Sequence, residues 1–164
     1  KNIDTHVSKC FKFCFVRNPY SWYESFWRFM KEYDWTDFSN YRTKNRFGLP
    51  TDEWNPIDPI MHCASNNFDE FIQNVLNEQP GFVANLYDRY ANPQYINFIG
   101  KQESIIEDSI TIFERLGISV SENIFHEIGK VNESQIPKPV WDEQLKKRIY
   151  ESEENAFTKY GYNK

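Results

Sequence analysis

The stretch Phe11–Phe29, FKFCFVRNPYSWYESFWRF, carries the strongest fold signal in the chain. Its first part, Lys12–Val16, is a short run of aromatic and β-favouring residues, which predicts a buried strand. Asn18-Pro19 then ends the strand, because proline fixes φ and has no N–H for a sheet. Helical spacing resumes over Ser21–Lys31. An arginine at a strand end, followed by a hydroxyl near the free N–H groups of a helix, is an arrangement that receives phosphate.

The order of these elements resembles the 3′-phosphate-binding segment of the PAPS-dependent sulfotransferases. A strand, the letters V-R-N-P at Val16–Pro19 and a serine eight residues after the arginine follow one another as in that family. The resemblance implies that Arg17 and Ser25 bind the 3′-phosphate of the sulfonate donor, 3′-phosphoadenosine 5′-phosphosulfate (PAPS). The residues alone leave a second interpretation open, in which Arg17 forms a structural ion pair and Ser25 faces solvent.

Two further stretches extend the resemblance to about half of the chain. Tyr95–Gly117 is similar to the family's strand-to-helix element, and Val131–Tyr162 is similar to its C-terminal tail, with VNES, a long helix and a closing F-x-x-Y-G-Y. The similarity is greatest to the carbohydrate-type and bacterial branch. It implies a P-loop NTPase-like sulfotransferase fold, in which helices flank a parallel sheet in three layers.

The alternation of strands and helices independently predicts an α/β fold with a parallel sheet. At 164 residues the chain fits a single domain, residues 1–164. Ligands of parallel sheets bind beyond the carboxyl ends of the strands. Arg17 and Lys101 both directly follow predicted strands, so we expect both cations at that edge.

The chain departs from the family pattern at the phosphate loop. Sulfotransferases resemble P-loop kinases, whose first strand runs into a loop that holds the 5′-phosphosulfate with N–H groups and a lysine. Neither Gly48 nor Gly100 lies in such a loop. We expect either an N-terminally truncated chain, without an upstream strand, loop and helix, or a homologue that has lost the loop. In both cases residues 1–164 alone are expected to be inactive.

A second departure lies at Lys101-Gln102. The family usually has an arginine and then an aromatic residue there, and the aromatic ring can lie against the adenine. Lys101 keeps the charge without the planar fork, and Gln102 cannot stack. These changes either weaken donor binding or leave it unaffected, if the two residues only orient the strand end.

Composition excludes several classes of protein. Aromatic residues make up 18% of the chain, which argues against disorder. The net charge of −5 argues against a nucleic-acid partner, although a local cluster such as Lys12, Arg17 and Arg28 could bind an anionic nucleotide. No apolar stretch is long enough to span a membrane and no signal peptide opens the sequence, so we expect a cytoplasmic protein.

Cysteine usage fits a reducing compartment, because the chain has three cysteines without a disulfide framework. His6, Cys10 and Cys14 recur every four residues, a spacing that suits metal ligands on a helix. Cys10 and Cys14 instead flank and occupy the predicted strand, where we expect them to be small buried residues. The sequence therefore predicts no metal cofactor.

Tyr33–Ile60 lacks periodicity and predicts a long loop or short irregular helices. Its aromatic residues could form a platform for a sugar ring or a hydrophobic plug under the loop. Its basic run could line an acceptor cleft or stay solvated. The aromatic residues are Trp35, Tyr41 and Trp54, and the basic ones are Arg42, Lys44 and Arg46.

Three helices are predicted in the remainder. Asn66 or Asn67 caps a helix that Pro80-Gly81 ends. Ser104 with Glu107 predicts a capping box, and Leu116-Gly117 ends that helix. Ile106, Ile110, Phe113 and Leu116 are expected to face inward. Ile118–Ile128 could be an edge strand or a loop, and after Pro137 and Pro139 one helix is expected over Trp141–Tyr160.

The resemblance implies transfer of a sulfonate from PAPS to a hydroxyl or amine acceptor, such as that of a glycan. His62 is a candidate general base, although a lone histidine can be structural and the family base can be a glutamate. Two alternatives stay open: a non-catalytic nucleotide- or glycan-binding module of the same fold, and another P-loop transferase such as a small-molecule kinase.

Overall fold

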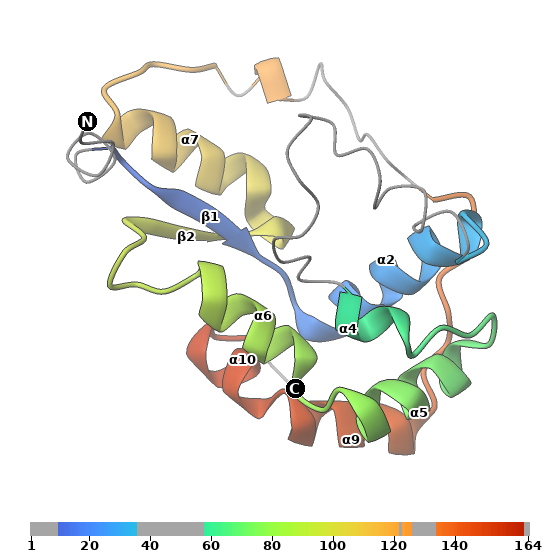
Figure 1. Cartoon of the computed structure of the whole chain (residues 1–164). Coiled ribbons are helices and arrows are strands. Elements are labelled where there is room, and N and C mark those ends of the chain that lie inside the picture. The colour runs from blue at the N-terminus through green and yellow to red at the C-terminus, as the bar shows by residue number, and fades with distance from the viewer. Residues whose placement is uncertain (1–9, 36–57, 122, 126–133, 163–164) are drawn as a thin grey trace, which may run out of the picture. The chain divides into compact units, whose positions relative to one another are not determined.

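The structure, a computed structural model, describes residues 10–35, 58–121, 123–125 and 134–162 (Figure 1). The chain divides into two compact units. The first takes in residues 1–17 and 87–132, and the second takes in residues 18–86 and 133–164. The assignment of residues 1–164 to a single domain stays a prediction.

The first unit contains a small parallel sheet. Strand β1 (Phe13–Val16) pairs with β2 (Phe98–Lys101), and the register joins Phe13 to Phe98 and Val16 to Lys101. A 3₁₀ turn, η1 (Gln102–Ser104), follows β2 and leads into helix α7 (Ile105–Arg115). The predicted α/β class with a parallel sheet is therefore confirmed.

Gly100 allows β1, β2 and α7 to pack closely. A Cβ atom built on Gly100 would lie 2.7 and 2.8 Å from ring atoms of Phe15 and 3.1 Å from the Cβ of Asp108. Carbon atoms in contact prefer separations of about 3.5–4.0 Å, so a side chain does not fit at this position. Glycine is thus required here for close packing.

The burial predicted for β1 is only partly right. Val16 is 2% exposed, but the Phe13 side chain is 49% exposed. Cys14 is half-buried, whereas Cys10, which the sequence predicted to be buried, is exposed. The short sheet covers only some of the strand's side chains.

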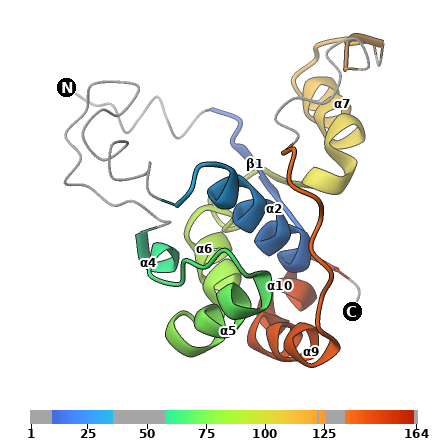
Figure 2. The ribbon, with the colours of Figure 1, turned by 90° about the vertical axis from the view of Figure 1, so that its right-hand side faces the viewer.

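The second unit is helical. It contains α2 (Pro19–Glu32), α4 (Asp58–Met61), α5 (Phe68–Glu78), α9 (Glu143–Ser152) and α10 (Glu154–Lys159), and α6 (Phe82–Tyr90) runs from this unit into the first. Helix α5 packs against α2 and α9 (Figure 2). The core is largely aromatic and aliphatic, and its fully covered side chains include Tyr23, Met30, Phe71, Ile72, Val75, Ile149 and Phe157.

Two helices begin at an asparagine N-cap, of which only that of α5 was predicted. The Asn18 side chain accepts from the Tyr20 N–H at 2.9 Å, and Pro19 occupies the first helical position of α2. The Asn67 side chain accepts from the Glu70 N–H at 3.0 Å, which decides between Asn66 and Asn67 as the cap of α5. Both helices therefore begin where local side-chain chemistry directs.

For helix α7, one prediction from the sequence is confirmed and two are wrong. Gly117 has φ +72°, so it ends α7 as predicted. The Ser104 hydroxyl does not cap the helix, because it donates to Asp108 Oδ2 at 2.8 Å. Leu116, which was predicted to face inward, is 45% exposed, and Ile112 is the buried residue of α7. The other three predicted residues, Ile106, Ile110 and Phe113, are half-buried. The described part of the following segment, residues 118–121 and 123–125, contains no strand.

The single helix predicted over Trp141–Tyr160 is wrong, because α9 and α10 are separated at Glu153. Glu153 is fully buried and accepts from the Tyr23 hydroxyl at 2.5 Å and from the Val83 and Ala84 N–H groups at 3.1 and 2.7 Å. The Ser152 hydroxyl accepts from the Gly81 N–H at 2.7 Å. The break thus caps the start of α6, whose first N–H groups have no partner within the helix.

Among the described residues, no helix is long and apolar enough to cross a membrane.

Candidate phosphate-binding site

Arg17 lies directly beyond the carboxyl end of β1, where the sequence predicted it. The last paired residues of the sheet are Val16 and Lys101, so the hydrogen-bonded pairing of the two strands stops just before Arg17. Tyr87 holds the Arg17 main chain instead. Its hydroxyl accepts from the Arg17 N–H at 3.0 Å and donates to the Arg17 carbonyl at 2.7 Å.

The guanidinium of Arg17 has no hydrogen bond or ion pair with any residue in the described part of the chain. Its side chain is half-buried. The structural ion pair that the sequence left open is therefore not found among these residues. A planar group with five N–H donors at this edge can bind a phosphate by two parallel hydrogen bonds.

The first turn of α2 offers fewer free N–H groups than the sequence analysis expected. Pro19 has no N–H, the Tyr20 N–H is bound by Asn18, and the Trp22 N–H donates to the Asn18 carbonyl at 2.8 Å. A phosphate at this segment would therefore depend mainly on side chains.

Ser25 lies further along α2 than predicted. It is the seventh residue of the helix, about 9 Å from its first residue at 1.5 Å per residue, and so not beside the free N–H groups. Its side chain is half-buried, and its hydroxyl has no hydrogen-bond partner among the residues that the structure describes. Arg17 belongs to the first unit and Ser25 to the second, and each is placed within its own unit.

Lys101 is the last residue of β2, opposite Val16, rather than the first residue beyond the strand as predicted. Arg17 and Lys101 nevertheless both lie at the carboxyl end of the sheet, as expected. The Lys101 N–H donates to Asp108 Oδ2 at 2.6 Å, the oxygen that also accepts from Ser104. Gln102, which stands where the family usually has an aromatic residue, is exposed in η1. Asp108 thus holds the end of β2, as Tyr87 holds the end of β1.

The other two cations of the predicted cluster have different environments. Arg28 donates to the carbonyls of Ile136 and Ser134 at 2.5 and 2.8 Å, so it holds the segment that precedes α9. Lys12 precedes β1 and lies at the opposite end of that strand from Arg17. The cluster of Lys12, Arg17 and Arg28 predicted for an anionic nucleotide is therefore wrong for Arg28 and Lys12.

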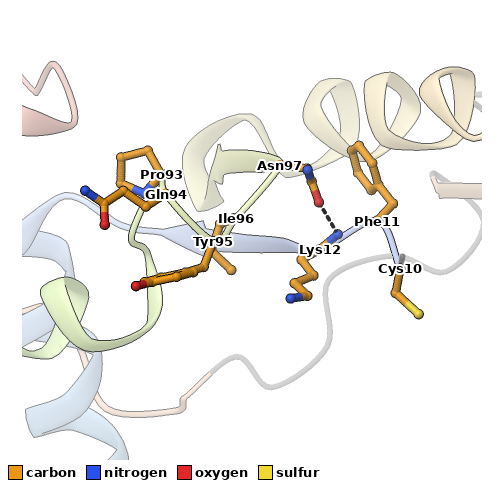
Figure 3. Close-up of a pocket in the computed structure, with 8 residues that line it drawn as sticks. All are labelled: Cys10, Phe11, Lys12, Pro93, Gln94, Tyr95, Ile96 and Asn97. Carbon is orange, nitrogen blue, oxygen red and sulfur yellow. Dashed lines mark hydrogen bonds between the residues drawn. The ribbon is translucent and has the colours of Figure 1, made fainter. Parts of the chain in front are cut away.

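A cavity of about 420 Å³ lies beside Lys12 at the amino ends of the strands (Figure 3). Asn97 Oδ1 accepts from the Lys12 N–H at 2.8 Å at the rim of this cavity, and Figure 3 shows the Tyr95 side chain pointing away from Lys12. The other lining residues are Cys10, Phe11, Pro93, Gln94 and Ile96. The cavity is at the wrong end of a parallel sheet for a phosphate site.

The remaining predicted site residues contribute little. His62 is exposed one residue after α4, and its role as a base stays a prediction. The Trp35 ring packs against the rings of Phe26 and Phe71, with centroid distances of 6.2 and 5.6 Å. For Trp35, these contacts favour the hydrophobic plug over the sugar platform. Positions 6, 41, 42, 44, 46 and 54 lie outside the described residues.

Among the described residues no group of three His, Cys, Asp or Glu side chains could hold a metal ion. Burial raises the pKa of the Cys14 thiol above its ordinary value. It also raises the pKa of Cys63 to about 11, with help from the charge of Glu78. Neither thiol is therefore activated as a thiolate near neutral pH.

Comparison with known proteins matches residues 1–163 to the family described as the sulfotransferase family. The chain belongs to the sulfotransferase family. No curated protein and no solved structure matches it significantly. The family match covers the segment of Arg17 and Ser25, the strand-to-helix element of Lys101 and the C-terminal helices.

Sequence reasoning missed two residues that hold the main chain at the candidate site. Tyr87 binds the Arg17 main chain, and Asp108 binds the Lys101 main chain. Tyr87 is 70 residues from Arg17, so no local pattern could have connected them. Asp108 follows Ser104 by one helical turn, and that spacing was the available signal.

Proposed function

We propose that this chain binds PAPS, and its product form 3′,5′-adenosine bisphosphate (PAP), at the carboxyl end of β1. The complete reaction would transfer a sulfonate from PAPS to a hydroxyl or amine acceptor, such as that of a glycan. The observation that carries the proposal is the Arg17 guanidinium. It follows a parallel strand, lacks a partner among the described residues and stands in the V-R-N-P segment of a sulfotransferase-family chain.

Arg17 and Ser25 would bind the 3′-phosphate, and their roles differ. The arginine offers a rigid fork and a permanent positive charge, which suit a phosphate better than a lysine would. The serine offers one hydroxyl donor. Both would act far from the sulfur. They would therefore determine how tightly the donor binds and which nucleotide is accepted, rather than the rate of the chemical step.

The reaction itself would be an in-line displacement in which positioning and charge neutralisation supply most of the rate. PAPS would supply the sulfonate. His62 is the proposed general base for the acceptor, and its exposed imidazole is open to a substrate. We further propose that the small sheet is part of a three-layer, P-loop-like fold of the carbohydrate-type branch.

The test is calorimetric titration with PAP. Loss of a hydrogen bond to a charged group costs about 1.5–3 kcal/mol, so Arg17→Ala should weaken binding about 10- to 150-fold. Ser25→Ala should weaken it about 3- to 10-fold, because a single neutral donor contributes less.

Two controls match these substitutions in charge and size. Arg148→Ala removes an exposed guanidinium on α9 that donates to Gln73, and Ser109→Ala removes a hydroxyl on α7. Both should bind PAP as the wild type does. Equal affinity of wild type and Arg17→Ala would refute the proposal.

A non-catalytic nucleotide-binding module of the same fold is the second candidate. The observation that favours it is that residues 1–164 contain no P-K-x-G-T-[ST] or Walker pattern to hold a 5′-phosphosulfate. We therefore propose that this chain alone binds PAP without turnover. Release of sulfonate from radiolabelled PAPS by the purified chain would contradict this candidate.

A further inference from the structure

Tyr87 contacts the main chain of Arg17 through its hydroxyl. It is 1% exposed, and its single hydroxyl bonds both polar main-chain atoms of the same residue. A phenolic hydroxyl can accept and donate at once, so both hydrogen bonds can be satisfied together. Both residues belong to the first unit.

The two hydrogen bonds from Tyr87 take the place of strand pairing at the point where the sheet ends. Val16 is the last residue of β1 that pairs with β2, and Arg17 is the first residue beyond it. A residue beyond a ladder can rotate about φ and ψ unless another group holds it. Tyr87 fixes both the N–H and the carbonyl of Arg17, and thereby fixes the direction in which the Arg17 side chain leaves the backbone.

We propose that Tyr87 is a positioning residue for recognition of the 3′-phosphate, acting through the main chain of Arg17. This inference rests on the proposed function, because it assumes that the Arg17 guanidinium binds that phosphate. Tyr87 itself touches no ligand. Its hydroxyl keeps the guanidinium aimed before the nucleotide arrives, so less ordering is needed on binding.

A second tyrosine, Tyr90, makes it possible to distinguish this positioning role from simple protection of the edge of β1. The hydroxyl of Tyr90, also on α6, donates to the carbonyl of Phe15 at 3.2 Å, and the Tyr87 and Tyr90 rings meet edge to face. Both hydroxyls thus bind the segment that runs from β1 into Arg17, but Tyr87 bonds Arg17 and Tyr90 bonds a residue inside the strand. If only the strand edge mattered, loss of either hydroxyl would have the same effect.

The experiment compares Tyr87→Phe and Tyr90→Phe, which remove one oxygen each and keep the rings. PAP and adenosine 5′-monophosphate (AMP) are titrated calorimetrically into each variant, since AMP lacks the 3′-phosphate. Tyr87→Phe should weaken PAP binding about tenfold, in line with the cost of a small misplacement of a binding group. It should leave AMP binding within about twofold of wild type, and Tyr90→Phe should leave the PAP-to-AMP ratio unchanged.

A double-mutant cycle supplies the sharpest readout. In the Arg17→Ala background, Tyr87→Phe should cause no further loss of PAP affinity, because the group that it positions is gone. A purely structural role would weaken PAP and AMP alike and would persist in that background. Either of those results would overturn the inference.

A second measurement does not depend on the folding of a variant. In the wild type, exchange of the Arg17 amide hydrogen should slow when PAP is added and stay unchanged with AMP. Unchanged exchange with saturating PAP would overturn the inference. Failure of the proposed function is recognised separately, because then the wild type and Arg17→Ala show the same PAP-to-AMP ratio.

Discussion

Removal of the Tyr23 hydroxyl should destabilise the second unit by a calculable amount. Tyr23 is fully buried in α2, and its hydroxyl donates at 2.5 Å to Glu153 Oε1. Tyr23→Phe keeps the ring and deletes that donor. Among the described residues, the Glu153 carboxyl group then keeps the Val83 and Ala84 N–H groups as its partners.

The magnitude depends on the charge of the acceptor, and the larger range applies where Glu153 is ionised. A hydrogen bond to a buried charged group contributes about 1.5–3 kcal/mol, against about 0.5–1.5 kcal/mol for a neutral acceptor. For a chain of this size, 1.5–3 kcal/mol corresponds to a fall in Tm of about 3–12 °C. The loss should therefore be obvious in thermal or urea unfolding followed by tryptophan fluorescence.

The effect of pH has a defined sign. Burial raises the pKa of Glu153, and the hydrogen bonds from Tyr23, Ala84 and Val83 oppose that rise. Because the folded pKa is raised, the stability that Glu153 contributes is fully present below the unfolded value, 4.5, and is lost as pH rises through the folded pKa. Tyr23→Phe raises the folded pKa further, so its destabilisation should grow as pH rises from about 4.5.

Two tyrosines of the same helix provide graded controls. The Tyr20 hydroxyl donates at 3.2 Å to the neutral carbonyl of Lys146, and Tyr33, at the end of α2, is 50% exposed. We expect the loss in unfolding free energy to decrease in the order Tyr23→Phe, Tyr20→Phe, Tyr33→Phe. A Tyr23→Phe variant as stable as Tyr33→Phe at pH 7 would refute the reasoning.

Two further substitutions test the packing of each unit. Gly100→Ala should destabilise the first unit by about 1–3 kcal/mol in urea unfolding, because its Cβ would lie 2.7 Å from the Phe15 ring. Phe15→Leu should recover part of that loss, and wild-type stability of Gly100→Ala would disprove the close approach. Arg28→Ala should increase hydrogen exchange at residues 134–141, since it removes the donors to the Ser134 and Ile136 carbonyls. Arg148→Ala is its control, and unchanged exchange at residues 134–141 in Arg28→Ala would contradict the proposed clamp.

The parts of the fold that sequence could predict are those that local chemistry specifies. Asn18-Pro19 ends β1 and caps α2, Asn67 caps α5 and Gly117 ends α7, and each signal lies within a few residues of its effect. Arg17 and Lys101 were predicted at strand ends for the same reason.

The parts that sequence could not predict depend on distant partners. Helix α6 was not predicted, and its first N–H groups are satisfied by Ser152 and Glu153, about 70 residues away. The run ESEEN at Glu151–Asn155 is typical of a solvated helix face, yet its central Glu153 is fully buried. The sequence predicts that Arg28 binds an anionic ligand. In the structure it binds two carbonyls, and these belong to residues 106 and 108 positions later in the sequence.

The most direct test of the central claim is a phosphorus NMR titration of PAP, whose 3′- and 5′-phosphates give separate resonances. If Arg17 holds the 3′-phosphate, the wild-type chain should shift and broaden the 3′ resonance. Arg17→Ala should abolish that change and leave any effect on the 5′ resonance in place. A 3′ resonance that responds equally to wild type and Arg17→Ala, or only a 5′ response in the wild type, would contradict the account.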